Sequence, residues 1–313
     1  MHSTKPPKRA LNGVLLLDKP IGISSNTALQ QARRLFHAEK AGHTGVLDPL
    51  ASGLLPICFG EATKFAQYLL DADKAYIATL KLGEASTTGD VEGEIIERGR
   101  NDITLTEFQA ACASLTGKIR QVPPMFSALK HEGKPLYEYA RKGITIERKA
   151  REIEIHSITI QSFSPPQAII DVHCSKGTYI RTLSEDIATQ MHTFAHLTAL
   201  RRTATAGFTI EQSHTLEQLT KLPEKQRDAL ILPCDVLIQH LPRINLNAEQ
   251  TQKLRFGQLT PVSHDFRQPE HTPLRAYDEM GNFIGLLEFI EKYRYLKALR
   301  LMNTTNKIST NPL

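Results

Sequence analysis

Cysteine is scarce in this chain, and none of it stands in a pattern typical of a metal site or a disulfide framework. Four cysteines occur among 313 residues, at positions 58, 112, 174 and 234, and no two form a C-x-x-C pair. No apolar run reaches the roughly 18 residues that a membrane-spanning helix requires. The polar, basic N-terminus has no apolar segment typical of a secretory signal. We therefore expect a reduced cytoplasmic protein without a metal centre or a membrane contact.

Signatures of several large enzyme classes are also missing. The sequence contains no P-loop, no G-x-G-x-x-G, no G-x-S-x-G and no H-E-x-x-H. We therefore expect no nucleotide, redox or metal cofactor. Hydrophobic and charged contents of 41% and 23% are ordinary for a globular protein, and the length predicts about two domains.

Positive charge is concentrated in one stretch of the chain. Residues 118–151 contain nine Lys or Arg and three Glu, whereas the rest of the chain contains 29 basic and 30 acidic side chains. The same stretch carries Phe126, Tyr137 and Tyr139. Basic side chains interleaved with aromatic ones suit phosphate contacts and base stacking, but a solvated surface helix gives a similar pattern. The stretch is a candidate nucleic-acid interface.

A segment rich in glycine and proline, residues 42–56 (GHTGVLDPLASGLLP), surrounds a single carboxylate, Asp48. Glycine allows backbone angles that other residues avoid and proline fixes φ, so the segment is predicted to be a tightly specified loop. Catalytic groups concentrate on such loops. Asp48 is either a nucleophile or a turn cap. The second role is possible because Asp before Pro often starts a turn. His43, five residues earlier, has either a structural or a functional role.

The rest of the pattern mixes strands and helices without a regular βαβ repeat, which favours an α+β fold. Alternation predicts strands and 3.6-residue periodicity predicts helices. Strands are predicted at residues 14–17, 76–82, 153–160 and 168–174, and helices from Ser24 or Ser25 to 36, at 61–70, at 136–141 and from 178 to 187. Tyr76 begins its strand on the inward face. Arg181 near a helix start is usually a surface residue, but a guanidinium can also keep a buried Asp ionised.

A second, smaller unit is expected after the proline-punctuated stretch 222–242. Residues 243–300 contain short strand-like runs separated by turn signals, which predicts a small β-rich module. The ends of the chain, residues 1–10 and 303–313, are basic or polar and are predicted to be disordered tails.

Six blocks of the chain together carry a family resemblance. They are GVLLLDKP (13–20), the segment 42–56, GEATK (60–64), KAY (74–76), PMFSALK (124–130) and CSKGTYIR (174–181). In this order they resemble the bacterial tRNA pseudouridine synthase B family, whose members isomerise uridine 55 in the TΨC loop of tRNA. The resemblance covers about residues 11–210, and segment 42–56 is similar to the catalytic motif of the family. It implies a pseudouridine synthase fold and this reaction.

The resemblance also implies roles for individual residues. Asp48 is the expected nucleophile, Arg181 its ion partner and Tyr76 the residue that stacks on the flipped uracil. The expected substrate-binding residues are His43, Tyr76, Tyr179 and Leu200. The expected RNA-binding residues are Lys64, Phe126, Lys130, Lys134, Arg141, Lys142 and Lys149. The family often has Tyr where Phe126 stands, so stacking without a hydroxyl contact is expected there.

The implied organisation is a catalytic domain over residues 11–240, with 118–151 as an RNA-clamping insertion, and a PUA-like RNA-binding module over 241–302. The expected partner is the T stem-loop of tRNA, the default oligomeric state is a monomer, and no cofactor is implied. Two rival functions stay open: an RNA N-glycosidase that releases the base, and a non-catalytic RNA-binding protein that folds tRNA. Also open is whether Asp48 attacks the uracil ring or ribose C1′.

Overall fold

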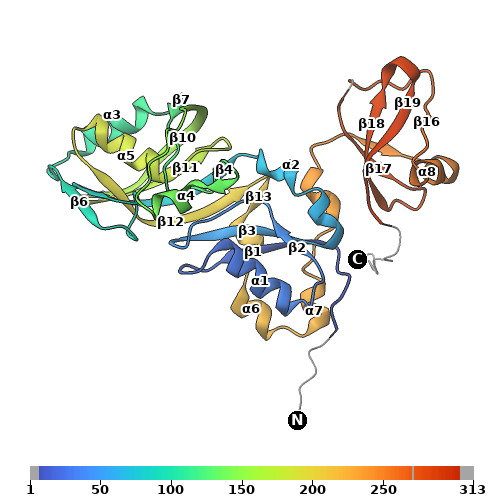
Figure 1. The fold of residues 1–313 in the computed structure, drawn as a ribbon, viewed down its shortest axis with the longest axis horizontal. Helices are drawn as coiled ribbons and strands as arrows, with labels where there is room; N and C mark the ends of the chain where they lie inside the picture. Colours follow the sequence, from blue (N-terminus) through green and yellow to red (C-terminus); the bar gives the residue numbers. More distant parts are fainter. Residues whose placement is uncertain (1–6, 270, 304–313) are drawn as a thin grey trace, which may run out of the picture.

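A large mixed sheet forms the centre of the molecule (Figure 1). The computed structural model describes residues 7–269 and 271–303, and within these ranges this sheet has ten strands. In spatial order they are β14 (His214–Thr215), β1 (Gly13–Lys19), β3 (Ala51–Phe59), β12 (Ala195–Thr205), β4 (Lys74–Leu82), β11 (Gln167–Cys174), β10 (Arg151–Ser164) and β7 (Gly117–Gln121), with β13 (Phe208–Thr209) on β12 and β2 (Ala41–His43) on β3. Most neighbours are antiparallel, but β1–β14 and β3–β12 are parallel pairs. The α+β class predicted from the sequence is confirmed.

Helical segments connect the strands of this sheet and of the C-terminal sheet described below. In the described residues they are α1 (Ser25–Leu35), η1 (Gly60–Lys64), α2 (Gln67–Leu70), α3 (Leu105–Ser114), α4 (Leu136–Ala140), α5 (Ile180–Gln190), η2 (Ile210–Gln212), α6 (Leu216–Lys221), α7 (Glu224–Asp228), η3 (Cys234–Ile238), α8 (Ala248–Arg255) and η4 (Glu291–Tyr293). The first of them begins where the sequence predicts, because the Ser24 hydroxyl accepts a hydrogen bond from the Thr27 amide. Its buried positions, 25, 28, 29 and 32, have helical spacing and face the core. The predicted helix 61–70 is instead two short helices, η1 and α2.

The segment 42–56 is not one continuous loop, so that prediction is wrong in part. Residues 41–43 form β2, and β3 begins at Ala51, which leaves residues 44–50 as the loop. Gly53 and Pro56 therefore belong to a buried strand. The glycine is needed there because β3 runs against β12: its φ is +103°, and a Cβ would collide with the backbone of Arg202. Glycine here marks a close approach of two strands rather than a turn.

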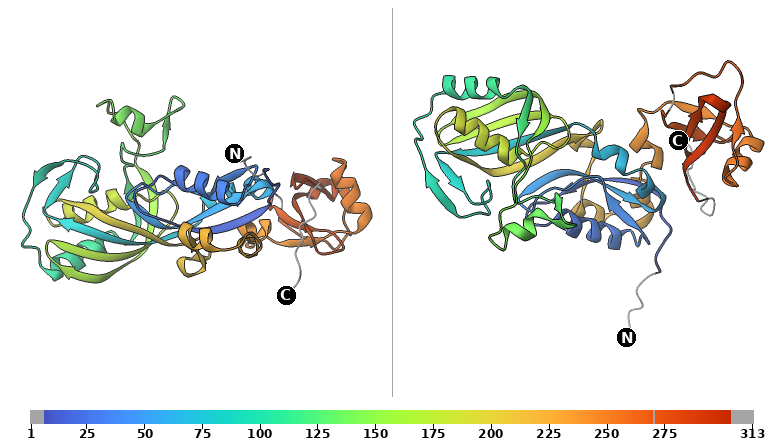
Figure 2. Two further views of the ribbon diagram at one scale, coloured as in Figure 1. Left: turned by 90° about the horizontal axis from the view of Figure 1, so that it is seen from below. Right: turned by 45° about the horizontal axis from the view of Figure 1, so that its top comes forward.

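The basic stretch forms a projection from the sheet (Figure 2, left). Residues 118–121 lie in β7, which pairs with β10 at the edge of the sheet, so the projecting part is shorter than 118–151. Beyond β7 the chain leaves the sheet, forms the small hairpin of β8 (Lys130–His131) and β9 (Lys134–Pro135) and then α4, and returns at Arg151. We call residues 122–150 the insertion. A second small hairpin, β5 (Glu84–Ser86) with β6 (Ile95–Arg98), follows β4.

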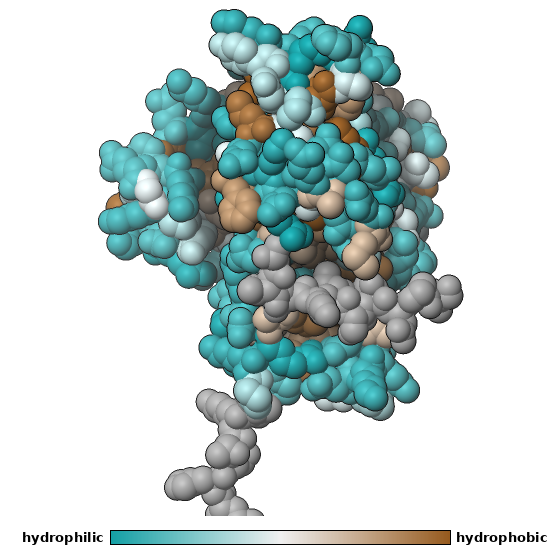
Figure 3. Space-filling model, turned by 90° about the vertical axis from the view of Figure 1, so that its right-hand side faces the viewer, coloured by the Kyte–Doolittle hydropathy of each residue, from teal (hydrophilic) through white to brown (hydrophobic). Residues whose placement is uncertain are grey.

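The C-terminal part is a separate five-stranded sheet within the described residues. Its spatial order is β15 (Arg243–Asn245), β17 (Leu274–Tyr277), β18 (Phe283–Ile290), β19 (Tyr295–Leu301) and β16 (Thr260–Pro261). The predicted β-rich character is confirmed, but helix α8 was not expected. On the face seen in Figure 3, the surface is mostly hydrophilic and hydrophobic residues form separate patches.

The C-terminal module packs against the main sheet through η1. The rings of Phe65 and Phe283 meet edge to face, with centroids 5.3 Å apart. Lys64 Nζ lies 2.7 Å from Glu61 Oε2 and donates a hydrogen bond of 2.9 Å to the Leu301 carbonyl. An apolar contact and a polar contact therefore hold the two sheets together at this junction.

The disordered tails predicted at the two ends of the chain can be compared with the structure only in part. Residues 1–6 and 304–313 lie outside the described residues, so the predicted tails are assessed only at residues 7–10 and 303. Arg9 is ordered by Asp228, with both guanidinium nitrogens 2.7 Å from its carboxylate oxygens. The predicted tail 1–10 is therefore too long. Among the described residues, no helix is long and apolar enough to cross a membrane.

Candidate active site

The loop that carries Asp48 is held at several points by the elements around it. The Ser25 hydroxyl, buried at the start of α1, accepts from the Leu47 amide at 2.7 Å and lies 3.0 Å from the Leu47 carbonyl, to which it donates. The Asp48 carbonyl accepts from the Ala51 amide at 3.0 Å, which closes a turn leading into β3. These bonds fix the backbone on both sides of the carboxylate, so Asp48 projects from a defined position.

Arg181 approaches Asp48 from the first turn of α5. The start of this helix is set by Gln121, whose side chain accepts from the Tyr179 amide at 2.8 Å and donates to the Tyr179 carbonyl at 3.2 Å. Arg181 Nη2 lies 2.9 Å from Asp48 Oδ2, and Arg181 Nε lies 3.7 Å from Asp90 Oδ2. The contact expected between Asp48 and Arg181 is therefore present, and a second carboxylate shares the same guanidinium.

The Arg181 guanidinium also binds backbone on both sides. It donates to the Thr88 carbonyl at 3.0 Å and to the Phe126 carbonyl at 2.6 Å. Thr88 follows β5, and Phe126 lies at the base of the insertion. One buried cation thus joins the Asp48 loop, the β5–β6 region and the insertion.

Burial dominates the electrostatics of Asp48. Desolvation raises its pKa above the ordinary aspartate value, and the negative charge of Asp90 acts in the same direction. Arg181 opposes both effects without overcoming them. The arginine thus acts in the direction that the sequence led us to expect, but desolvation outweighs it. With two carboxylates and one guanidinium, the cluster carries excess negative charge when both acids are ionised.

Lys19 supplies a further cation beneath the site. Its side chain is fully buried, and its ammonium donates to the Pro20 carbonyl at 2.9 Å and the Ile23 carbonyl at 2.6 Å. Burial lowers its pKa to about 8, although the nearby Asp48 carboxylate acts in the opposite direction. These two bonds fix the connection between β1 and α1, which forms part of the wall beside the Asp48 loop.

A cavity of about 640 Å³ opens over Asp48. Its walls come from the Asp48 loop, the start of α1, the region after β5, Arg181 and the insertion. Of the residues predicted for the site, those that line it are His43, Asp48, Phe126, Lys130, Arg141 and Arg181. The structure thus brings the carboxylate, its ion partner and part of the basic stretch around one space of the size of a small-molecule site.

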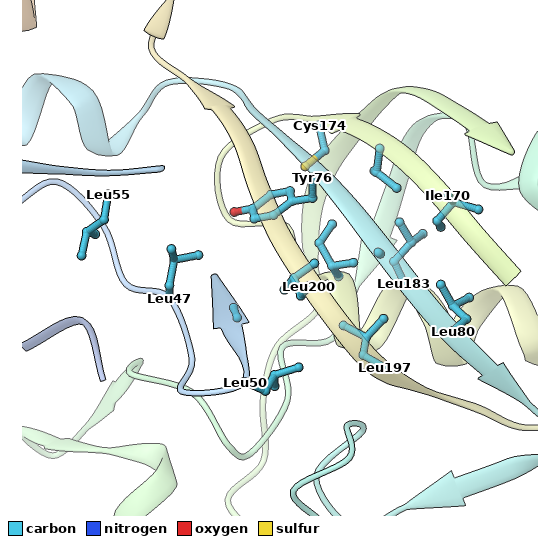
Figure 4. Packing of buried hydrophobic residues seen from close by; sticks show 14 of the residues in the cluster. Leu47, Leu50, Leu55, Tyr76, Leu80, Ile170, Cys174, Leu183, Leu197 and Leu200 are labelled. Carbon is cyan, nitrogen blue, oxygen red and sulfur yellow. The ribbon is translucent and has the colours of Figure 1, made fainter. Parts of the chain in front are cut away.

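Tyr76 and Leu200 lie in the core next to this cavity and are not among the described residues that line it. Figure 4 shows the Tyr76 ring pointing from β4 toward Leu47 and Leu55, with Leu200 beside it. Tyr76 is 7% exposed and Leu200 8%. Burial raises the pKa of the Tyr76 hydroxyl, an effect that the neighbouring Arg202 guanidinium partly offsets.

His43 and Tyr179 sit at two further positions around the site. His43 ends β2 and lines the cavity, while its Nδ1 is buried without a hydrogen-bond partner in the described structure. Desolvation and the positive charge of Arg202 lower the pKa of His43. Tyr179 is half-buried immediately before α5, and burial raises the pKa of its hydroxyl.

The predicted RNA-binding lysines are not all in one place. Lys134, Lys142 and Lys149 are exposed on the insertion, outside the cavity lining that the structure describes. Lys64 lies in η1, where its ammonium joins Glu61 to the C-terminal module. The Lys64 ammonium therefore forms part of the contact between the two sheets.

Sequence reasoning missed Asp90, which is 2% exposed and shares Arg181 with Asp48. Asp90 Oδ1 accepts from the Thr88 hydroxyl at 2.5 Å and from the Glu92 amide at 3.1 Å, so the side chain cannot turn away from Arg181 without losing both bonds. The Gly89-Asp90 pair is a turn signal, but nothing in the sequence places it against a helix that starts ninety residues later.

The chain is similar to known proteins over most of its length. The chain matches a model described as TruB family pseudouridylate synthase (N terminal domain) over residues 33–180, and one described as tRNA pseudouridylate synthase B C-terminal domain over residues 181–239. The "tRNA pseudouridine synthase B" of Neisseria meningitidis serogroup B is 70% identical over 304 residues, which are 97% of this chain and 98% of the relative. The protein of the same name from Thiobacillus denitrificans is 51% identical over 284 residues, 91% and 94% of the two chains.

A solved structure shares the fold. A chain from a structure described as a Cbf5-Nop10-Gar1 complex superposes with a TM-score of 0.70 at 23% identity, covering 94% of this chain and 85% of that one. At this identity the likeness concerns the fold alone. It extends over both the mixed sheet and the C-terminal module.

Proposed function

The chain belongs to the TruB family of pseudouridylate synthases, and from this we propose that it converts uridine 55 of tRNA to pseudouridine at the cavity over Asp48. The observation that carries the proposal is the pair of the half-buried Asp48 and the buried Arg181, at the floor of a cavity whose other walls bear cations and an aromatic ring. A polyanionic substrate is drawn to such cations, and a base can stack on Phe126.

The target base must leave the folded RNA loop before it can reach a carboxylate on the cavity floor. Flipping costs a few kcal/mol of lost stacking, which phosphate contacts to the insertion would offset. We propose that Lys130 and Arg141, which line the cavity, act first in this role, and that the exposed Lys134, Lys142 and Lys149 extend the clamp. Lys64 would act indirectly, by holding the C-terminal module in place.

In the proposed reaction, ionised Asp48 attacks either the uracil ring or ribose C1′, and the N-glycosidic bond breaks. The detached uracil turns and rejoins the ribose through C5, and the bond to Asp48 breaks, which regenerates the carboxylate. Loss of the C5 proton and gain of a proton at N1 complete the product. Arg181 holds the Asp48 carboxylate in position and favours its ionised form. We assign Tyr76 to stacking on the flipped base. Since its ring is buried in the free protein, this requires that the core beside Leu200 opens when the base enters.

We propose roles for the remaining parts in the same scheme. His43 and Tyr179 would contact the RNA loop and the base at opposite sides of the site. The catalytic domain would span residues 11–240, and the module over 241–302 would be a PUA-like RNA-binding domain that contacts tRNA away from the target base. We propose that the active form is a monomer.

Replacing Asp48 with Asn tests the proposal. We expect Asp48→Asn to abolish pseudouridine in an unmodified tRNA transcript while tRNA binding stays within about twofold of the original protein. Asp171→Asn on β11, outside the cavity lining, is the matched control and should retain full activity. Pseudouridine formed by the Asp48 variant would refute the nucleophile assignment.

The same reaction mixture separates the rivals. Isomerisation changes no mass and releases no base, whereas an N-glycosidase leaves free uracil and an abasic site. A non-catalytic tRNA-folding protein gives neither product. Mass spectrometry of the RNA, combined with chemical mapping of pseudouridine, therefore distinguishes the three functions in one experiment.

A further inference from the structure

A second cavity, which we call the α1 groove, lies between α1 and the α6–α7 segment. It has a volume of about 510 Å³ and is lined by the basic side chains of Arg34, His37 and Arg227, together with Gln31, Thr220 and two leucines. Within the described residues, no acidic side chain lines it. The groove therefore offers hydrogen-bond donors and positive charge over an apolar base.

The acidic residues near this groove already have other partners. Asp228, next to Arg227 in the chain, forms a two-point contact with Arg9, and Glu224 lies 3.0 Å from the same guanidinium. The cations of the groove are thus not neutralised from within the protein by these acids.

Two arginines of the groove have unused donor capacity. Arg227 Nε is buried without a hydrogen-bond partner, and its guanidinium lies 5.9 Å from the centre of the Phe36 ring, which orients it. Arg34 is exposed, and its side chain makes no hydrogen bond or ion pair to any residue that the structure describes. A buried donor without a partner is costly, and a bound anion would satisfy it.

Helix α1 connects the α1 groove to the cavity over Asp48. Asn26 lines that cavity, and Arg34 lines the groove. Positions 26, 30 and 34 are four residues apart and so lie in one stripe on the helix surface. Eight residues span about 12 Å of helix, which corresponds to roughly three or four nucleotides along a duplex strand. A nucleic acid in the main cavity can therefore reach the groove along this polar stripe.

We propose that the α1 groove binds a backbone phosphate of the same tRNA whose target uridine enters the main cavity. Guanidinium groups match phosphate oxygens in geometry and charge, and the Gln31 amide can add a neutral donor. This inference rests on the proposed function, because it takes tRNA as the substrate. It adds a contact at the C-terminal end of α1, whereas the main cavity lies at the N-terminal end of this helix, so the RNA would be bound at both ends of α1.

The test measures the salt dependence of tRNA binding by the full chain. Arg34→Gln removes one exposed charge and should leave the fold intact. Lys225→Gln removes another exposed charge, on α7 outside the groove, and is the matched control. For each variant, the dissociation constant of an unmodified tRNA transcript is measured from about 0.05 to 0.5 M salt, and pseudouridine formation is measured at saturating tRNA.

If a phosphate binds here, Arg34→Gln should reduce the slope of log affinity against log salt by about 0.7–0.9 and weaken binding about five- to eightfold at about 0.1 M salt. The rate at saturating tRNA should stay within about twofold, because Arg34 does not line the main cavity. Lys225→Gln should leave the slope unchanged. Equal slopes for the two variants would overturn the proposal.

A titration with inorganic phosphate distinguishes tRNA from a free anion. If Arg34→Gln abolishes phosphate binding but leaves the tRNA slope unchanged, the groove is a free-anion site and the proposal is wrong. If Arg34→Gln lowers the salt slope as expected but the wild-type protein forms no pseudouridine, the proposed function is contradicted and the groove assignment stands.

Discussion

In the cluster of Asp48, Arg181 and Asp90, the arginine and Asp90 are buried, so removing the arginine should have a strong effect that depends on pH and on Asp90. Arg181→Met keeps the side-chain length but removes the cation from between two carboxylates. At an effective dielectric constant of about 20, opposite charges separated by the 3.7 Å between Arg181 and Asp90 attract by about 4 kcal/mol. Asp48, whose side chain is 37% exposed, contributes less because solvent screens it. Breaking a buried pair of this kind typically costs about 3–5 kcal/mol.

We therefore expect Arg181→Met to lower the free energy of unfolding by about 3–5 kcal/mol, a large part of the roughly 5–15 kcal/mol that is usual for a domain. Urea denaturation at neutral pH measures this loss. Without the cation the buried carboxylates bind protons more readily in the folded state, so the loss should shrink as the pH falls. Arg201→Met, which breaks the more exposed Arg201–Asp18 pair, is the control and should cost about 1 kcal/mol or less.

Adding Asp90→Asn identifies the cause of the loss. In Asp90→Asn alone, the asparagine can still accept from the Thr88 hydroxyl and the Glu92 amide, and Arg181 keeps Asp48 as its ion partner, so this change should cost less than Arg181→Met. In the Arg181→Met background it removes an unpaired buried charge and should recover about 1–3 kcal/mol. If the two substitutions instead add independently, the instability comes from the lost Arg181 hydrogen bonds or from packing, and the electrostatic reasoning is refuted.

Three further predictions concern other parts of the protein. Because desolvation raises the pKa of Asp48, the rate of pseudouridine formation should begin to fall at a higher pH than it would with an ordinary aspartate. For the same reason, Asp48→Asn should raise the melting temperature at neutral pH, and this difference should disappear below the ordinary aspartate pKa. Equal melting temperatures at neutral pH would contradict the raised pKa. Gly53→Ala should destabilise the protein by about 2 kcal/mol or more in urea titrations, because its Cβ would collide with the Arg202 backbone; a neutral effect would mean that β3 and β12 can separate at no cost. Lys64→Met should speed limited proteolysis between the two sheets, because the lysine donates to the Leu301 carbonyl; Glu61→Gln should have a smaller effect, because a glutamine can still accept from the Asn303 amide; unchanged cleavage in Lys64→Met would show that the apolar contacts suffice.

Local patterns in the sequence predicted much of the secondary structure. Alternation identified β4 with Tyr76 on its inward side, and the serine cap identified the start of α1. The failure at segment 42–56 has a physical cause. It was predicted as a loop because glycine and proline usually mark turns, but Gly53 and Pro56 occupy a buried strand, and at Gly53 the neighbouring backbone leaves no room for a larger residue. The need for a glycine at this position follows only from the neighbouring strand β12.

The same contrast holds for the site. The sequence by itself determined the family, the carboxylate Asp48 in its constrained segment and the basic stretch 118–151, because each is carried by contiguous runs of residues. Only the tertiary structure decided that Asp90 shares Arg181 with Asp48, that Tyr76 and Leu200 lie in the core beside the cavity, and that Lys64 joins the two sheets. These features depend on distances between segments up to 237 residues apart in the chain. Strand pairing and burial set such distances, and no local pattern of residues records them.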